Sequence, residues 1–303
     1  MNELRKPLPK AMKETRPILE DITIVIPTLG RPILENCLYW IASGSAWPGG
    51  LVVVDQGSNP QARGWVETLK EFGIDALYLP SGQRGRASGI NRGLTNVKTR
   101  FAAITDDDCF VAAEWIEIMA KLSAENSGAI LTGRIEAAGE GVPVAVTSQV
   151  PAAYRYPRLT FDSMSGGNMG TSMSVFDKVG PFDESSFVRT AEDAEWAYRA
   201  LRAGVPIIYA PELVVRHFGW RDDHKRLTQI RDYARSHGGF YGKYLRKGDA
   251  FIAVRAMVHH GRALRWWLRG MMTKNRPMAF YGWAYLTGLL PGIIAGMRKG
   301  GAA

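Results

Sequence analysis

The 303-residue sequence has little cysteine and no recognisable export signal. Its two cysteines, Cys37 and Cys109, lie far apart and match no metal-binding or redox spacing. Without a disulfide framework, the chain suits a reducing compartment. Residues 1–20 carry charges throughout and contain no apolar run of signal-peptide length, so we do not expect secretion.

Several motifs that identify common enzyme classes are also absent. No G-x-G-x-x-G follows the first apolar segment, and the sequence contains no G-x-x-x-x-G-K-S/T. These absences weigh against a dinucleotide-dependent oxidoreductase and a P-loop NTPase. The H-E-x-x-H and G-x-S-x-G patterns are missing as well.

Acidic residues are missing from the C-terminal part of the chain. The sequence has 38 Lys and Arg against 29 Asp and Glu, a formal net charge of +9. The 54 residues after Asp249 contain eight Lys or Arg and no Asp or Glu. A nearly neutral body is therefore followed by a basic tail, and arguments from charge concern the tail.

The body of the sequence alternates apolar strands with helices. Ile22–Pro27, Leu51–Val54 and Phe101–Thr105 are continuous apolar runs, typical of strands buried on both faces. Residues 33–43 and 61–72 are expected to be helices. The pattern predicts an α/β fold with a mostly parallel sheet and helices on both faces.

Polar side chains stand at the carboxyl end of each expected strand: Thr28, Asp55 and the run Asp106–Asp108. Ligands bind at the carboxyl ends of strands in open α/β sheets, so this convergence indicates a binding site. An isolated D-x-D is more often a solvated acidic turn, but here the aspartates follow a buried strand. Asp106 and Asp108 can both reach one Mg²⁺ or Mn²⁺, with substrate phosphate supplying further oxygen ligands.

A second acidic pair, Glu192 and Asp193, opens an expected helix over 194–203. Acidic residues in a first turn can simply complement the helix dipole, which is the alternative interpretation. Downstream we expect a strand at 207–209 and the end of another at 214–218. His217 lies in the latter and is a candidate third metal ligand.

Taken in order, these segments resemble glycosyltransferase family 2, the inverting enzymes of the GT-A fold, over roughly residues 21–220. The matching segments are ITIVIPTLGR, LVVVDQGS, RGRASGINRGL, ITDDDCF, GGNMGTSMSVFDKVGPFDE, AEDAEW and RHFGW. The order of the seven carries the resemblance, because no single segment is specific. Members often have Asp where this chain has Glu195, and we expect that position to be structural.

The resemblance implies roles for individual residues. Asp193 would be the general base that takes the proton of the acceptor hydroxyl. The implied metal ligands are Asp106, Asp108 and His217. The implied contacts of the donor, expected to be a UDP-sugar, are Pro27, Thr28, Gly30, Arg31, Asp55, Arg86, Asn91, Asp106 and Asp107. The implied acceptor contacts are Gly167, Asn168 and Glu192.

The basic tail begins with an amphipathic pattern over residues 251–272. One helical face holds Arg255, His259, Arg262 and Arg269, and the opposite face holds Met257, Leu264, Leu268 and Met271. With two adjacent tryptophans, this pattern is typical of a helix that binds an anionic membrane surface. The alternative is a helix packed on the body with solvated arginines. Long apolar runs beside the aromatic residues favour lipid over nucleic acid.

Residues 279–297 form an uncharged stretch of 19, close to the ~20 needed to span a bilayer. Basic residues flank both ends, so the positive-inside rule gives no orientation. With Pro291 and four glycines inside this stretch, a re-entrant or interfacial hairpin is expected at least as much as a span. Gly288, Gly292 and Gly296 form a row that indicates helix association, and a homo-oligomer through the C-terminal helices is one consequence.

The sequence thus predicts a polar lead-in (1–20), a nucleotide-sugar-binding half (21–110), an acceptor and catalytic half (111–220), a helical extension (221–249) and a membrane-associating tail (250–303). The expected function is a glycosyltransferase that depends on Mn²⁺ or Mg²⁺, at the cytoplasmic face of a bacterial inner membrane. It would extend a glycan or polyprenol-linked acceptor in polysaccharide or glycoconjugate biosynthesis. A nucleotidyltransferase and an inactive scaffold of polysaccharide assembly are the alternatives.

Overall fold

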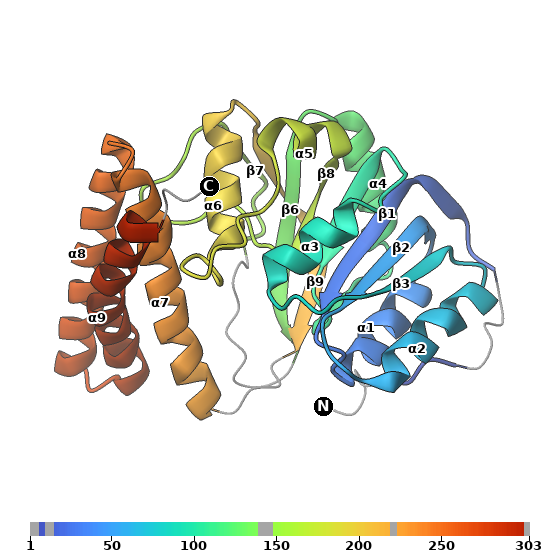
Figure 1. The fold of residues 1–303 in the computed structure, drawn as a ribbon, viewed down its shortest axis with the longest axis horizontal. Helices are drawn as coiled ribbons and strands as arrows, with labels where there is room; N and C mark the ends of the chain where they lie inside the picture. The colour runs from blue at the N-terminus through green and yellow to red at the C-terminus, as the bar shows by residue number, and fades with distance from the viewer. Residues whose placement is uncertain (1–5, 10–14, 139–147, 219–222, 300–303) are drawn as a thin grey trace. The chain divides into compact units, whose positions relative to one another are not determined.

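The computed structural model describes residues 6–9, 15–138, 148–218 and 223–299 (Figure 1). The chain divides into two compact units. The first, which we call the sheet unit, comprises residues 1–156, 164–182 and 197–219. The second, the helical unit, comprises residues 157–163, 183–196 and 220–303. The finer division expected from the sequence stays a prediction.

The N-terminal half of the sheet unit is a parallel arrangement of four strands, in the order β3-β2-β1-β4. These strands are β1 (Ile18–Thr28), β2 (Trp47–Asp55), β3 (Ala76–Pro80) and β4 (Phe101–Thr105). Thr28 of β1 lies beside Asp55 of β2, and Asp55 beside Pro80 of β3. The strand ends therefore meet at one edge, as the sequence predicts.

The other half makes the sheet mixed. Strand β8 (Asn168–Ser172) runs antiparallel to both β4 and β6 (Ile130–Ala138). Strand β9 (Ile207–Phe218) is parallel to β6, and both β5 (Cys109–Val111) and β7 (Ala152–Tyr154) pair antiparallel with β9. The described residues form a nine-stranded sheet in this way. The expected fold class is confirmed.

Helices cover both faces of the sheet, because its central strands are apolar on both sides. Ile24 and Ile26 of β1 pack in one core with side chains of α1 (Ile33–Ala42) and α2 (Pro60–Glu71). Val25 points to the opposite face, toward α3 (Arg86–Leu94). Its side chain lies so close to Gly93 of α3 that a Cβ on that glycine would overlap it. The unit also contains α4 (Trp115–Glu125) and α5 (Met173–Val179).

The expectation of separate strands at 207–209 and 214–218 is wrong, because β9 is continuous. Its pairing with β6 shifts: Gly133 lies beside Ala210, whereas Arg134 lies beside Val214. Three residues, 211–213, therefore bulge out of β9 without ending it. In the bulge, the carbonyl oxygen of Leu213 lies close to Gly133, and a Cβ atom on Gly133 would overlap this oxygen.

The helical unit consists mainly of α7 (Asp223–Leu245), α8 (Ala250–Met272) and α9 (Arg276–Lys299), together with the start of α6 (Glu192–Arg202). The glycine row of α9 faces α7: Cβ atoms at Gly292 and Gly296 would overlap the carbonyl oxygens of Arg235 and Gly239. The row thus serves helix packing within one chain, and it gives no support to a homo-oligomer.

The basic side expected for α8 is divided in the structure. Arg255 and His259 are each only 5% exposed, whereas Arg269 of the same expected side is exposed. Arg255 forms an ion pair with Asp162, which also lies 3.1 Å from His237 Nε2. His259 accepts or donates a hydrogen bond of 2.9 Å at Nδ1 with the Tyr241 hydroxyl. The partly exposed carboxylate of Asp162 therefore draws Arg255 of α8 inward.

A pair of glycine substitutions tests the helix packing. Gly292→Ala should lower the free energy of unfolding by about 1–3 kcal/mol, because the new methyl group meets α7 backbone. Gly261→Ala in α8 should raise it by about 0.5–1 kcal/mol, because nothing lies within 4 Å of the added Cβ. Urea denaturation followed by circular dichroism measures both. Equal effects of the two substitutions would contradict the packing.

The Asp162 cluster predicts a pH-dependent stability. Arg255 and His237 hold the pKa of Asp162 well below its usual range. The ionised Asp162 carboxylate therefore stabilises the folded state above pH ~4, and this stabilisation is lost as the pH falls further. Asp162 raises the pKa of His237. The protonated imidazole of His237 therefore stabilises the folded state below pH ~6.5, and this stabilisation is lost as the pH rises through the raised pKa.

Asp162→Asn should therefore lower the free energy of unfolding by about 3 kcal/mol, since it leaves the buried Arg255 charge uncompensated. The difference from the unsubstituted protein should be largest between about pH 4 and pH 6.5. Urea denaturation across this range measures it. A difference independent of pH would contradict the assigned pKa shifts.

Candidate active site

The run Asp106–Asp108 follows β4, and its three carboxylates occupy different environments. Asp107 is 1% exposed. It accepts hydrogen bonds from the Thr28 hydroxyl at 2.5 Å and from Arg31 Nε at 3.1 Å, and it forms an ion pair with Arg31 Nη2. Burial raises the pKa of Asp107 to about 6, against the opposing effect of Arg31. Asp107 thus ties the end of β1 to the end of β4.

Thr28 and Gly30 set the geometry of the turn that carries Arg31. The Gly30 N–H donates to Thr28 Oγ1 at 2.9 Å, and Gly30 has a φ of +68°, which favours glycine. Arg31 is only partly exposed and reaches Asp108 Oδ2 at 3.2 Å as well as Asp107. A cation is therefore fixed at the edge where the strands end.

Asp106 is paired with a second arginine. Its Oδ1 accepts a hydrogen bond from Arg86 Nε at 2.7 Å. Arg86 is the first residue of α3 and follows Gly85, whose φ is +140°. Gly166 and Gly167 lie against this pair: a Cβ on Gly166 would come within 2.6 Å of Arg86 Nη1, and one on Gly167 within 3.0 Å of Asp106 Oδ2. The two glycines leave room for the ion pair.

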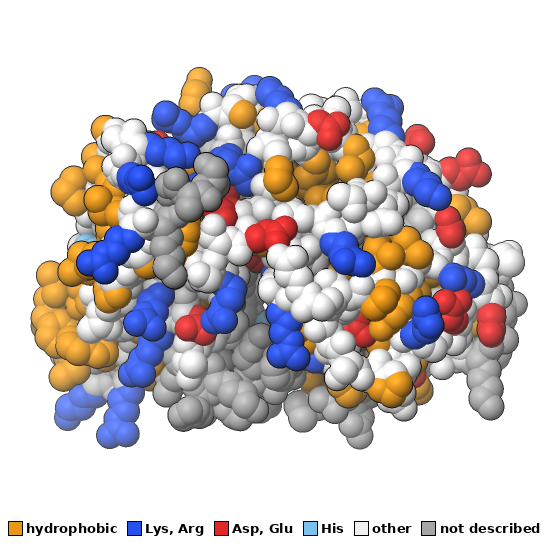
Figure 2. Space-filling model, viewed as in Figure 1, with side chains coloured by type: hydrophobic (Ala, Val, Ile, Leu, Met, Phe, Trp, Pro, Cys, Tyr) orange, Lys and Arg blue, Asp and Glu red, His pale blue; other side chains and the backbone are white. Residues whose placement is uncertain are grey.

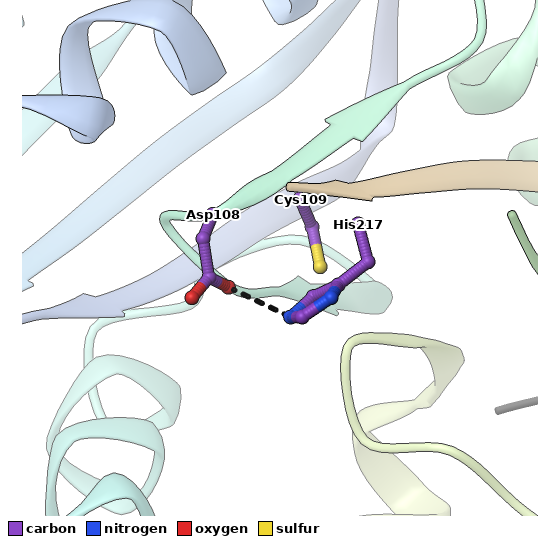
Figure 3. Close-up of side chains that lie close together, drawn as sticks. All are labelled: Asp108, Cys109 and His217. Atoms are coloured by element: carbon purple, nitrogen blue, oxygen red, sulfur yellow. Dashed lines mark ion pairs between the residues drawn. The ribbon is translucent and has the colours of Figure 1, made fainter. Parts of the chain in front are cut away.

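Asp108, Cys109 and His217 form a group that could hold a metal ion (Figure 3). Cys109 of β5 lies beside His217 of β9 in the antiparallel register, and Asp108 directly precedes β5. His217 Nε2 lies 3.6 Å from Asp108 Oδ1, and one ligand atom from each residue lies within 4.8 Å of the others. A carboxylate and an imidazole suit Mn²⁺.

The structure therefore brings two of the three predicted metal ligands together. Asp108 and His217 converge, whereas Asp106 is held by Arg86. The sequence alone does not point to Cys109, because it has no partner cysteine at a metal-binding spacing. Burial raises the pKa of its thiol well above the ordinary value, so the sulfur is neutral and a weak ligand as it stands. The sequence feature that could have indicated Cys109 as part of this group is its position directly after Asp108.

Asp55 lies at the end of β2 and is 1% exposed. Its two oxygens accept hydrogen bonds of 2.8 Å from the Gly57 N–H and from the Tyr78 hydroxyl. Burial together with this carboxylate raises the pKa of Tyr78 to about 12. The neighbouring Gln56, which the sequence analysis missed, donates to the carbonyls of Gln83 and Gly85 and so holds the loop that leads to Arg86.

Two predicted ligand-binding amides are engaged with the protein itself. The Asn91 side chain forms two hydrogen bonds with the backbone of Phe182, at 2.9 and 2.8 Å. Asn168 is completely buried: its Oδ1 accepts from Trp115 Nε1 at 2.9 Å, and its Nδ2 donates to the carbonyls of Leu213 and Arg134. Asn168 therefore joins α4, β6 and β9, and both of its N–H donors are used.

The acidic residues at the start of α6 belong to the helical unit. Glu192 is 3% exposed, whereas Asp193 is partly exposed and accepts a hydrogen bond from the N–H of Ala194 at 2.8 Å. Glu195 is fully buried and accepts from Lys243 Nζ at 2.8 Å and from the Tyr244 hydroxyl at 2.6 Å. This ion pair supports the structural role expected for Glu195.

Solved structures of glycosyltransferases share this fold. The mannosyltransferase PcManGT from Pyrobaculum calidifontis, in complex with GDP-Man and Mn²⁺, matches with a TM-score of 0.61 and 16% identity, over 94% of this chain and 87% of that one. Residues 1–349 of TarS from S. aureus match with a TM-score of 0.56 and 15% identity, over 88% of this chain and 90% of that one. The chain thus has the GT-A fold of nucleotide-sugar transferases.

Sequence comparison then identifies the family. The profile of glycosyl transferase family 2 matches residues 23–180, which is more than half of the chain. The chain belongs to glycosyl transferase family 2. Pre-mycofactocin glycosyltransferases from two strains of Mycobacterium tuberculosis are 27% identical over 267 residues, covering 83% of this chain and 53% of theirs. The chain spans about half the length of these curated relatives.

Replacement of Asn168 distinguishes a structural from a ligand-binding role. Asn168→Ala should lower the free energy of unfolding by about 3 kcal/mol, because Trp115 Nε1 and two carbonyls lose their buried partner. Thr95→Ala, at an exposed position after α3, is the control and should change it by less than about 0.5 kcal/mol. Urea denaturation measures both. Unchanged stability of Asn168→Ala would contradict the structural role.

Proposed function

We propose that this protein is a metal-dependent, inverting glycosyltransferase. It transfers a sugar from a nucleoside-diphosphate donor, with a UDP-sugar as the expected donor, to a hydroxyl group of a glycan or lipid-linked acceptor. The observation that carries the proposal is the cluster at the strand ends: three carboxylates, two arginines and His217 gathered where sheets of this kind bind nucleotides.

The donor side of the proposal rests on the charges of this cluster. Arg31 and Arg86 are fixed by Asp107 and Asp106, so both guanidinium groups are oriented before a substrate arrives. A diphosphate can then bind without the cost of ordering these side chains. Several structural neighbours support a nucleotide donor: TarS was solved with UDP-GlcNAc, PcManGT with GDP-Man and Mn²⁺, and GalNAc-T7 with UDP, GalNAc and Mn²⁺.

Asp108 and His217 would hold the metal ion, with Mn²⁺ favoured over Mg²⁺ by the imidazole ligand. When bound, the ion would offset the negative charge that develops on the departing nucleoside diphosphate. Arg31 lies 3.2 Å from Asp108, so the protein supplies positive charge at the same edge. The pair of guanidinium groups would also orient the diphosphate for in-line displacement of the sugar.

Asp193 is the proposed general base. A single displacement inverts the configuration at the sugar C1, and it needs a carboxylate to accept the proton of the attacking hydroxyl. Asp193 is partly exposed at the start of α6, whereas the adjacent Glu192 and nearby Glu195 are buried. The positive end of the helix dipole favours an ionised carboxylate there. Glu192 and Gly167 remain proposed acceptor contacts.

Substitution of the proposed base gives the direct kinetic test. Asp193→Asn should lower the rate of transfer by about 10²–10⁴-fold while donor binding is retained. Asp177→Asn, at an exposed carboxylate of α5, is the matched control and should transfer at the unsubstituted rate. Transfer is measured by release of the nucleoside diphosphate, and NMR of the product gives the anomer. Activity of Asp193→Asn equal to that of the control would refute the assignment.

Substitution of the proposed metal ligand gives an independent binding test. Loss of a residue that merely hydrogen-bonds to a metal ligand weakens metal binding by roughly 10–100-fold. Asp108→Asn removes a ligand itself and should weaken Mn²⁺ binding by more than this. Asp75→Asn, at an exposed carboxylate before β3, is the control and should bind Mn²⁺ normally. Calorimetric titration of Mn²⁺ in the presence of UDP measures the affinity. Equal affinities for the two variants would exclude Asp108 as a ligand.

A further inference from the structure

The side of α8 that faces away from the helical unit is apolar. Its exposed residues are separated by three, four or seven positions, so they form one stripe along the helix. We call this stripe the outer α8 face; it comprises Val254 (42% exposed), Met257 (65%), Leu264 (44%), Leu268 (47%) and Met271 (62%). In Figure 2, hydrophobic side chains gather over the part of the helical unit where Figure 1 draws α8.

This arrangement reverses the usual amphipathic pattern of a surface helix, in which the apolar side faces the protein. The opposite side of α8 is buried and includes two polar groups, since Arg255 is paired with Asp162 and His259 with Tyr241. Rotation of α8 to hide its apolar stripe would therefore break the ion pair of the buried Arg255. The outer α8 face is held outward by the fold, and exposed apolar patches of this kind mark interaction surfaces.

The turn between α8 and α9 extends the same surface. Met272 is 83% exposed, and Thr273, Lys274, Asn275 and Arg276 beside it are exposed as well. A methionine pair at a protruding turn, with Lys and Arg next to it, can enter an apolar layer while the cations stay at its polar boundary. Trp283 of α9 is 47% exposed and contacts Trp267 with the two rings tilted, and tryptophans favour this boundary.

The charged residues of α8, α9 and the turn between them are all positive. Arg265 and Arg269 line a shallow apolar groove together with Gly261, Leu264 and Leu268. No acidic residue occurs after Asp249 in the sequence. A second copy of the chain docked through the same face would bring arginines against arginines, which is unfavourable. A surface with negative headgroups over an apolar interior complements both the charge and the stripe.

We propose that the outer α8 face and the α8–α9 turn dock this protein on bilayers that contain anionic lipid. The helix would lie in the plane of the surface with its methionines and leucines among the acyl chains, and Arg265, Arg269, Lys274 and Arg276 would contact phosphate groups. The proposal concerns the helical unit and stands independently of the proposed glycosyl transfer.

The same geometry argues for docking rather than spanning. Helix α9 is long and apolar enough, over Arg276–Arg298, to cross a membrane. Its glycine row, however, is seated on the backbone of α7, whose Arg235 and Lys243 would have to follow it into the hydrocarbon. The protein should therefore leave membranes in alkaline carbonate, as a peripheral protein does.

Co-sedimentation of the full-length protein with vesicles tests the proposal. Vesicles of phosphatidylcholine with phosphatidylglycerol should bind it, and vesicles of phosphatidylcholine alone should bind it less. Leu264→Glu combined with Met271→Glu should weaken binding by about tenfold or more. Lys274→Gln combined with Arg276→Gln should weaken it by about fivefold per charge removed, and less at high salt.

Val150→Glu is the matched control, because Val150 is an apolar residue of the sheet unit that is 70% exposed. It should bind vesicles as the unsubstituted protein does. Circular dichroism and UDP binding should be the same for all variants, which separates loss of docking from loss of fold or of the donor site. Absence of binding to anionic vesicles would overturn the proposal, as would a loss of binding in Val150→Glu equal to that in the α8 variants. Retention of the protein on membranes in alkaline carbonate would also overturn it. So would a dimer that binds no lipid and that Leu264→Glu converts to monomers.

Discussion

The buried carboxylate of Asp107 is the interaction on which the site depends. It accepts a hydrogen bond from Thr28 at the end of β1, holds Arg31 in the next turn, and lies within the run that follows β4. Burial raises the pKa of Asp107 to about 6, and the hydrogen bond and charge of Arg31 oppose that increase. Asp106 and Asp108 then project from a backbone that is fixed on both sides.

The balance of charge follows from this arrangement. Two arginines face three carboxylates, and Asp108 shares Arg31 with Asp107 while it also approaches His217. The cluster thus places carboxylate oxygens and an imidazole nitrogen close together, and a divalent cation accepts such ligands. An ion pair of a carboxylate with an arginine also determines local structure in the helical unit. There Asp162 draws Arg255 inward and thereby leaves the apolar side of α8 exposed.

Much of the fold and part of the site could be predicted from the sequence, and the reasons are local. A parallel strand that is buried on both faces is mostly apolar, so its end is visible where polar residues follow the apolar run, as at Thr28, Asp55 and Asp106. Asn168 could not be understood in this way, because its partners Trp115, Arg134 and Leu213 are distant in the chain. The period of α8 defines two faces, but Asp162, 93 residues before Arg255, decides which one is buried.

The central claim is that the strand-end cluster activates a nucleotide sugar, and nucleotide release tests it most directly. A panel of UDP-, GDP- and dTDP-sugars would be incubated with the full-length protein, with and without Mn²⁺, in the presence of a lipid extract as acceptor source. The account predicts release of a nucleoside diphosphate from at least one donor, only when the metal is present. Binding of no nucleotide across the panel, with the protein folded and Mn²⁺ supplied, would contradict it.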